Sequence, residues 1–123
     1  MSSLFHELPL SRDLKCRQGE TILINESLTL DGATADLTNC TLTLIVTTAE
    51  DTSTAVIEET QSIVDADGGL WQLHVADEDT LELAPGEYVY AVVCEWPVGH
   101  AAFPLGATRT LYAGRLHVQL PLG

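Results

Sequence analysis

Hydrophobic residues recur at every second position in five stretches of the chain, which is the spacing of half-buried β-strands. The stretch 87–96 also carries Val89, Ala91 and Val93 on its second face, which predicts a central strand covered on both sides. The inward sets are Ile22, Ile24, Leu28 and Leu30; Leu42, Leu44 and Val46; Trp71, Leu73 and Val75; Tyr88, Tyr90, Val92, Cys94 and Trp96; and Leu116, Val118 and Leu120.

Two positions leave the strand pattern open. Glu26 interrupts the first inward set, and either a β-bulge or a place at a sheet edge accounts for it. The stretch 55–64 is rich in β-forming residues and fits either one strand or two short ones.

Turn residues separate these stretches. Asp31-Gly32 and Asp67-Gly68 are dipeptides that favour tight turns, and acids at 77–79 followed closely by Pro85 predict only one or two turns of helix. About seven strands with almost no helix predict an all-β fold, an antiparallel β-sandwich. We assign residues 1–13 to an N-terminal arm and residues 14–123 to the sandwich domain.

The spacing of Leu83, Gly86 and Tyr88 is that of a tyrosine corner. In such a corner, a tyrosine near the start of a strand returns its hydroxyl to the backbone a few residues upstream. These three residues are therefore predicted to serve the fold, and the short helix is expected just before them.

Acidic residues dominate the charge of this 123-residue chain: 18 Asp and Glu face 5 Lys and Arg, giving a formal net charge of −13. Nucleic acids and anionic membranes attract clustered cations, so this balance argues against both as partners. It fits a well-solvated protein or one that docks on a basic partner. The first residues lack the pattern of a secretory signal, so we expect the protein to stay in the cytoplasm or assemble there.

Residues with metal or catalytic chemistry are scattered. Cys16, Cys40 and Cys94 are an odd number at irregular spacing, and we expect reduced thiols, with Cys94 in the core. The DADGG turn lacks the later ligands of a calcium loop, and the four histidines have no partner at ligand spacing. No catalytic motif is present. The sequence predicts no enzyme, no catalytic residue, no metal ligand and no cofactor.

The stretch 98–107, VGHAAFPLGA, contains no Asp, Glu, Lys or Arg, although a loop between two late strands is expected to be polar. Either Phe103 and Leu105 fold back over one end of the sandwich, or they form a contact surface for another subunit. The same alternatives hold for Leu4, Phe5 and Leu8 in the arm. These five residues are the candidate assembly contacts.

The order of the turn and corner motifs resembles the immunoglobulin-like domain of phage baseplate upper proteins over about residues 17–120. The matching positions are Asp31, Gly32, Asp36, Leu37 and Thr38; Asp67 and Gly68; Asp79, Thr80, Leu83, Pro85, Gly86 and Tyr88; and Gly114, Leu116 and Val118.

This resemblance implies an immunoglobulin-like sandwich with a structural role in a virion, assembled in the cytoplasm of the bacterial host. The implied partners are other virion proteins of the tail, baseplate, neck or capsid, with a homo-oligomer also open. The family continues into a stalk or receptor-binding part, whereas this chain ends at Gly123, so we expect it to decorate, plug or adapt part of a particle. The alternative is a stand-alone binding module for a surface ligand such as a glycan.

Overall fold

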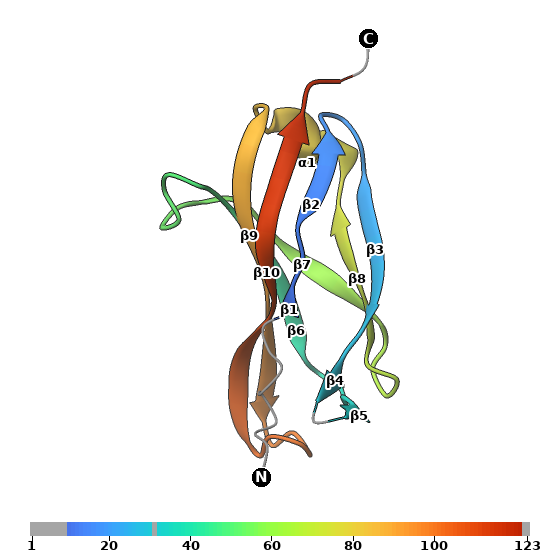
Figure 1. The fold of residues 1–123 in the computed structure, drawn as a ribbon. Coiled ribbons are helices and arrows are strands. Elements are labelled where there is room, and N and C mark those ends of the chain that lie inside the picture. The colour runs from blue at the N-terminus through green and yellow to red at the C-terminus, as the bar shows by residue number, and fades with distance from the viewer. Residues whose placement is uncertain (1–9, 31, 122–123) are drawn as a thin grey trace.

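Two layers of β-strands and one short helix form the part of the chain that the computed structural model describes, residues 10–30 and 32–121 (Figure 1). The elements are β1 (Leu10–Ser11), β2 (Leu14–Arg17), β3 (Ile22–Ser27), β4 (Thr29–Leu30), β5 (Ala33–Thr34), β6 (Thr41–Thr48), β7 (Ala55–Asp65), β8 (Leu70–Val75), α1 (Asp77–Glu82), β9 (Gly86–Val98) and β10 (Leu105–Gln119).

The strands follow one path in the order β1-β10-β9-β6-β7-β8-β3, with β2 also paired to β10 and β4 paired to β5 in a separate hairpin. Most neighbours are antiparallel, but β1 and β2 both run parallel to β10. The sheet is therefore mixed, and the expectation of a purely antiparallel sandwich is corrected at this edge. Leu10 and Ser11, assigned to the arm from sequence, belong to the sheet.

β7 is a single strand of 11 residues, which resolves the ambiguity at 55–64. Its first half pairs with β6 and its second half pairs with β8. Because one strand takes part in both layers, the path is continuous from the N-terminal strands to β3, and the sandwich is nearly closed.

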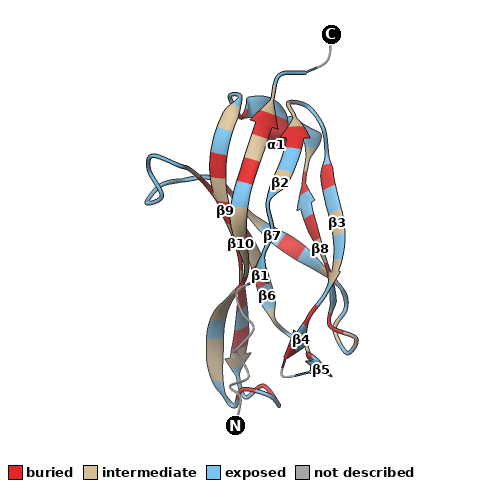
Figure 2. Ribbon diagram, in the orientation of Figure 1, coloured by how far each residue is buried: buried red, intermediate tan, exposed pale blue. Residues whose placement is uncertain are grey.

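The core lies where the alternating sets face one another (Figure 2). The sets of β6, β8 and β9 are buried, as the spacing predicted. Leu120 is the exception: it is 66% exposed, because β10 ends at Gln119 and the alternation no longer holds beyond that residue. β9 is the central strand of its layer, hydrogen-bonded to β6 on one side and β10 on the other.

The corner between α1 and β9 has the expected hydrogen bond. The Tyr88 hydroxyl donates to the carbonyl of Ala84 at 2.7 Å, and Leu83 is buried beside it. Gly86 has a φ of 149°, a conformation that a residue with a Cβ rarely adopts. Thr80, fully buried in α1, donates to the carbonyl of Glu20 at 2.7 Å and so ties the helix to the connection between β2 and β3.

Glu26 lies at the open edge of the sandwich. β3 pairs only with β8, and its register there is unbroken, so the edge position and not a bulge accounts for this acid. Its carboxylate accepts from the Tyr112 hydroxyl at 2.6 Å and forms an ion pair with Arg12. The Arg12 carbonyl in turn accepts from the Tyr90 hydroxyl at 2.6 Å. Polar contacts thus connect the two ends of the strand path.

The contacts of Glu26 with Tyr112 and Arg12, which we call the seam, predict a specific loss of stability. Glu26→Ala removes the acceptor of the Tyr112 hydroxyl and the partner of Arg12, so we expect it to lower the free energy of unfolding by about 1–3 kcal/mol. Glu87→Ala is the matched control, since its ion pair with Arg115 is exposed on both sides and is expected to contribute less than about 1 kcal/mol. Urea unfolding of both variants measures the difference, and equal losses would contradict a structural role for the seam.

Candidate interaction surface

The predicted contact residues fall into two groups. Leu4, Phe5 and Leu8 lie outside the described residues, so their role as assembly contacts stays a prediction. Phe103 lies in the connection between β9 and β10, Leu105 is the first residue of β10, and both are among the described residues. This connection forms the lower end of the molecule in Figure 1.

The β9–β10 hairpin extends beyond the strand next to it. β6 pairs with β9 as far as Thr41 opposite Glu95, whereas β9 and β10 continue to pair until Val98 lies opposite Leu105. The intervening turn is closed by backbone hydrogen bonds, with the Gly99 N–H donating to the Pro104 carbonyl at 2.8 Å. The hairpin therefore ends in an ordered tip, which we define as residues 97–107.

Phe103 and Leu105, which the sequence could not distinguish, differ in their burial. Phe103 is buried, with its ring centroid 4.7 Å from that of Trp96, so it folds back onto the sandwich and does not belong to the exposed surface. Leu105 is 91% exposed. The interpretation of a folded-back cap thus describes the position of Phe103, and only Leu105 remains available as a surface contact.

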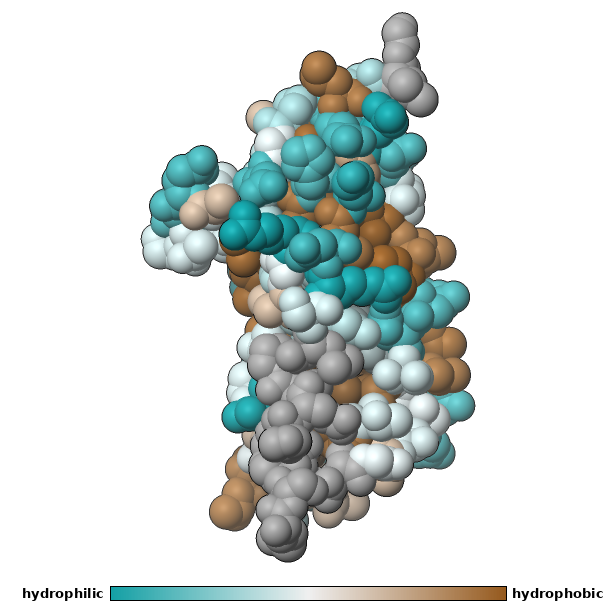
Figure 3. All heavy atoms as spheres, viewed as in Figure 1, coloured by the Kyte–Doolittle hydropathy of each residue, from teal (hydrophilic) through white to brown (hydrophobic). Residues whose placement is uncertain are grey.

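Val98 joins Leu105 on the surface of the tip. The two residues are a directly opposed pair across the strands, so their side chains lie on one face, and Val98 is 80% exposed. Sequence reasoning placed Val98 in the uncharged loop but did not single it out. The signal was present in its spacing, since Val98 follows Trp96 in the same alternation but lies beyond the end of the core. Figure 3 shows apolar atoms at this lower end of the molecule.

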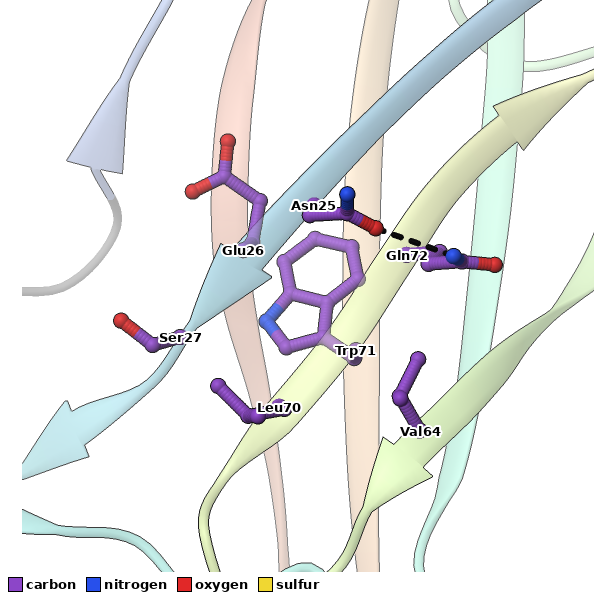
Figure 4. Close-up of a pocket in the computed structure, with 7 residues that line it drawn as sticks. All are labelled: Asn25, Glu26, Ser27, Val64, Leu70, Trp71 and Gln72. Atoms are coloured by element: carbon purple, nitrogen blue, oxygen red, sulfur yellow. Dashed lines mark hydrogen bonds between the residues drawn. The ribbon is translucent and has the colours of Figure 1, made fainter.

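A hollow of about 570 Å³ lies on the layer formed by β3, β7 and β8 (Figure 4). Gln72 donates to the Asn25 side chain there at 2.9 Å, and Val64 and Leu70 are exposed. The aromatic residue of this hollow, Trp71, is only 1% exposed and therefore offers no ring face to a ligand. The core likewise takes up Tyr88, Tyr90 and Trp96. These aromatic rings give no platform for the stacking of a glycan.

Candidate metal and thiol chemistry finds little support among the described residues. They contain no group of three or more His, Cys, Asp or Glu side chains placed to hold a metal ion. The three cysteines are free, and Cys94 is fully buried, as predicted. Burial raises the pKa of the Cys94 thiol and so disfavours the reactive thiolate. The DADGG stretch is a turn in which the Asp65 carboxylate accepts from the Gly68 N–H at 3.2 Å.

One acid, Glu59, has an altered protonation equilibrium. A hydrogen bond with Asp79 in α1, together with burial and the charges of Asp79 and Glu78, raises the pKa of the Glu59 carboxyl in β7 to about 7. A neutral carboxyl can donate to an ionised one, whereas two charged carboxylates repel each other. This contact therefore fastens α1 to β7 most firmly when Glu59 is protonated.

Comparison with known proteins supports the fold. No protein-family model matches the chain, and no curated protein matches it. The N-terminal domain of phage TP901-1 ORF48 is similar in structure, with a TM-score of 0.58 over 88% of this chain and 85% of that chain, at 13% sequence identity. At this identity the likeness shows the fold alone.

A structure of voltage-gated sodium channel (VGSC) beta subunits, described as a photo-crosslinking analysis of cell-adhesive interactions, aligns with a TM-score of 0.42. Its sequence identity is 11%, and the match covers 90% of this chain and 93% of that one. The architecture is an immunoglobulin-like β-sandwich, as the sequence predicted. None of the helices in the described part of the chain has the length and apolar character needed to cross a membrane.

Paired substitutions at the tip test the difference between its two large apolar residues. Phe103→Ala leaves a cavity beside Trp96, and we expect it to lower the free energy of unfolding by about 3 kcal/mol. Leu105→Ala alters an exposed side chain and is expected to change it by less than about 0.5 kcal/mol. Denaturant unfolding followed by tryptophan fluorescence measures both. Similar effects from the two variants would show that the tip is not packed in this way.

The Glu59–Asp79 contact predicts a pH dependence. The folded-state pKa of Glu59 lies above its value in an unfolded chain, so the folded state binds more protons between about pH 4.5 and 7, and stability falls as pH rises through this range. Glu59→Gln stays neutral, so we expect it to flatten this part of the profile and to be more stable than the unmodified protein at pH 8. Glu58→Gln, on the exposed side of the same strand, is the control. Thermal unfolding between pH 4.5 and 8 gives the profiles, and an unchanged slope for Glu59→Gln would refute the assignment.

Proposed function

We propose that this protein is a structural component of a phage or prophage virion, in the tail, baseplate, neck or head decoration, and that it acts through protein–protein contacts without catalysis. The tip of the β9–β10 hairpin is its contact surface. Its partners are other virion proteins, and contacts between copies of the chain are compatible with the same surface. The protein is made and assembled in the cytoplasm of the bacterial host and works in the particle.

The exposed tip is the observation that carries this proposal. Val98 and Leu105 place two aliphatic side chains side by side in solvent, on a hairpin that continues past the neighbouring strand β6. A chain with a net charge of −13 has no Asp, Glu, Lys or Arg between residues 97 and 108. The buried centres of protein interfaces are depleted of charge in the same way, because a charged group loses its hydration there.

The fold adds support of a more general kind. One similar solved structure is a domain of a phage protein, and an immunoglobulin-like sandwich presents its loops on a rigid frame. The acidic surface disfavours the nucleic acid inside a particle as a partner, since phosphates repel it. Contact with protein is the interaction that the fold, the charge and the tip favour together.

Incorporation into particles tests the proposal. Particles are purified from a host that lacks the chromosomal copy and is supplied with the unmodified chain, Leu105→Asp or Leu23→Asp, and peptides of the chain are quantified by mass spectrometry. We expect the unmodified chain and Leu23→Asp in equal amounts, because Leu23 is exposed on β3, away from the tip. A charge at 105 is expected to reduce incorporation at least about tenfold, through the cost of burying it in a contact.

The two ways in which this experiment can fail have different meanings. If the unmodified chain is missing from purified particles, the virion role is wrong. If Leu105→Asp is incorporated as well as the unmodified chain, the contact lies elsewhere on the molecule. Circular dichroism of the three purified proteins verifies that each substitution leaves the fold intact.

A further inference from the structure

A cavity of about 340 Å³ lies beside the exposed tip, between the tip and the chain that leads into β6. Its wall includes Asp36 and His100, with Val98 at its margin. The side chain of His100 is only 3% exposed, whereas that of Asp36 is 41% exposed. Of these two side chains, that of His100 is therefore buried and that of Asp36 can be reached from solvent.

The hydrogen bonds of His100 determine which of its nitrogens carries the proton. The backbone N–H of Ala102 donates to Nδ1 at 3.0 Å, so Nδ1 uses its lone pair and the neutral ring carries its proton on Nε2. No described residue accepts a hydrogen bond from Nε2. A buried donor without an acceptor is costly, so an acceptor that reaches this N–H would remove a penalty. A metal ion would need the lone pair of Nε2, which this tautomer does not offer.

Asp36 supplies the opposite chemistry. Its Oδ1 accepts from the backbone N–H of Thr38 at 2.9 Å and from the Thr38 hydroxyl at 2.6 Å. These bonds, the hydroxyl bond first, lower the pKa of the Asp36 carboxyl, so it is an ionised acceptor at neutral pH. Oδ2 lies 3.9 Å from Nε2 of His100, which is beyond a direct hydrogen bond. The Asp36 carbonyl accepts from the Trp96 indole at 3.2 Å, which fixes the segment in place.

We propose that this cavity binds a serine or threonine hydroxyl of a partner protein. A hydroxyl oxygen placed about 2.8 Å from both atoms accepts from Nε2–H of His100 and donates to Oδ2 of Asp36. A carbonyl oxygen satisfies only the histidine and would face the carboxylate without a proton between them. The exposed aliphatic side chains of Val98 and Leu105 would cover the rest of the inserted segment, and no exposed aromatic ring lines the cavity for a sugar.

This inference rests on the proposed contact at the tip and adds its chemistry: an aliphatic surface with one polar anchor. Anchors of this kind give specificity, because a segment that lacks the hydroxyl leaves the histidine donor without an acceptor in a site closed to water. The binding test below uses the purified chain alone, so its outcome is independent of whether the chain is found in virions.

The test compares two probes of nearly equal shape. N-acetylthreonine N-methylamide and N-acetylvaline N-methylamide are titrated into the isotope-labelled chain, and NMR follows the Nε2–H signal of His100 and the carboxyl carbon of Asp36. We expect saturable shifts of both signals with the threonine probe and at least about tenfold weaker binding of the valine probe, because valine lacks the hydroxyl that forms both hydrogen bonds. Equal binding of the two probes, or no saturable shift with either, overturns the proposal.

Two variants and a third probe complete the design. His100→Phe removes the donor while keeping a ring, and Asp36→Asn keeps Oδ1 while replacing the second acceptor with a donor. Both should abolish the preference for threonine over valine, and unfolding curves verify that they remain folded. If either folded variant keeps the preference, the assignment is wrong. Methyl glucoside tests the other source of hydroxyls, and binding tighter than that of the threonine probe would overturn a protein partner in favour of a saccharide.

Discussion

The pairing of β9 with β10 is the interaction on which the other features of this molecule depend. These are the two longest strands, and one face of β9 supplies Tyr88, Tyr90, Val92, Cys94 and Trp96 to the core. The same pairing continues past the end of β6 and carries the tip into solvent. A single hairpin therefore joins the most buried part of the fold to its most exposed apolar residues, Val98 and Leu105 at the tip.

Closure of the sandwich constrains the strands at its open edge. β7 belongs to both layers, so the path opens only between the N-terminal strands and β3. The edge there is bridged by the Glu26 carboxylate with Arg12 and Tyr112. Gly114 allows the backbone of β10 to lie close to the backbone of Arg12, because a Cβ at this position would lie 2.1 Å from the Arg12 carbonyl oxygen. The glycine of the last strand motif thus has a steric reason within this fold.

The sequence predicted most of the buried faces, because alternation in a strand reports directly on which side chains point inward. It also predicted the corner at Tyr88, whose local spacing determines its hydrogen bond. It could not distinguish Phe103 from Leu105, since both are large apolar residues in one uncharged loop and only the turn at Gly99 decides which faces Trp96. The parallel pairing of β1 and β2 with β10, and the meeting of His100 with Asp36, join residues far apart in the chain and leave no periodic signal.

The proposed function depends on the tip, and not on the larger hollow on β3 and β8. Hydrogen–deuterium exchange of the chain, measured free in solution and within purified particles, tests this claim most directly. We expect amides of residues 97–107 to become strongly protected in the particle, while those of β3 and β8 exchange as they do in the free protein. Protection confined to β3 and β8, with the tip exchanging freely in both states, would contradict it.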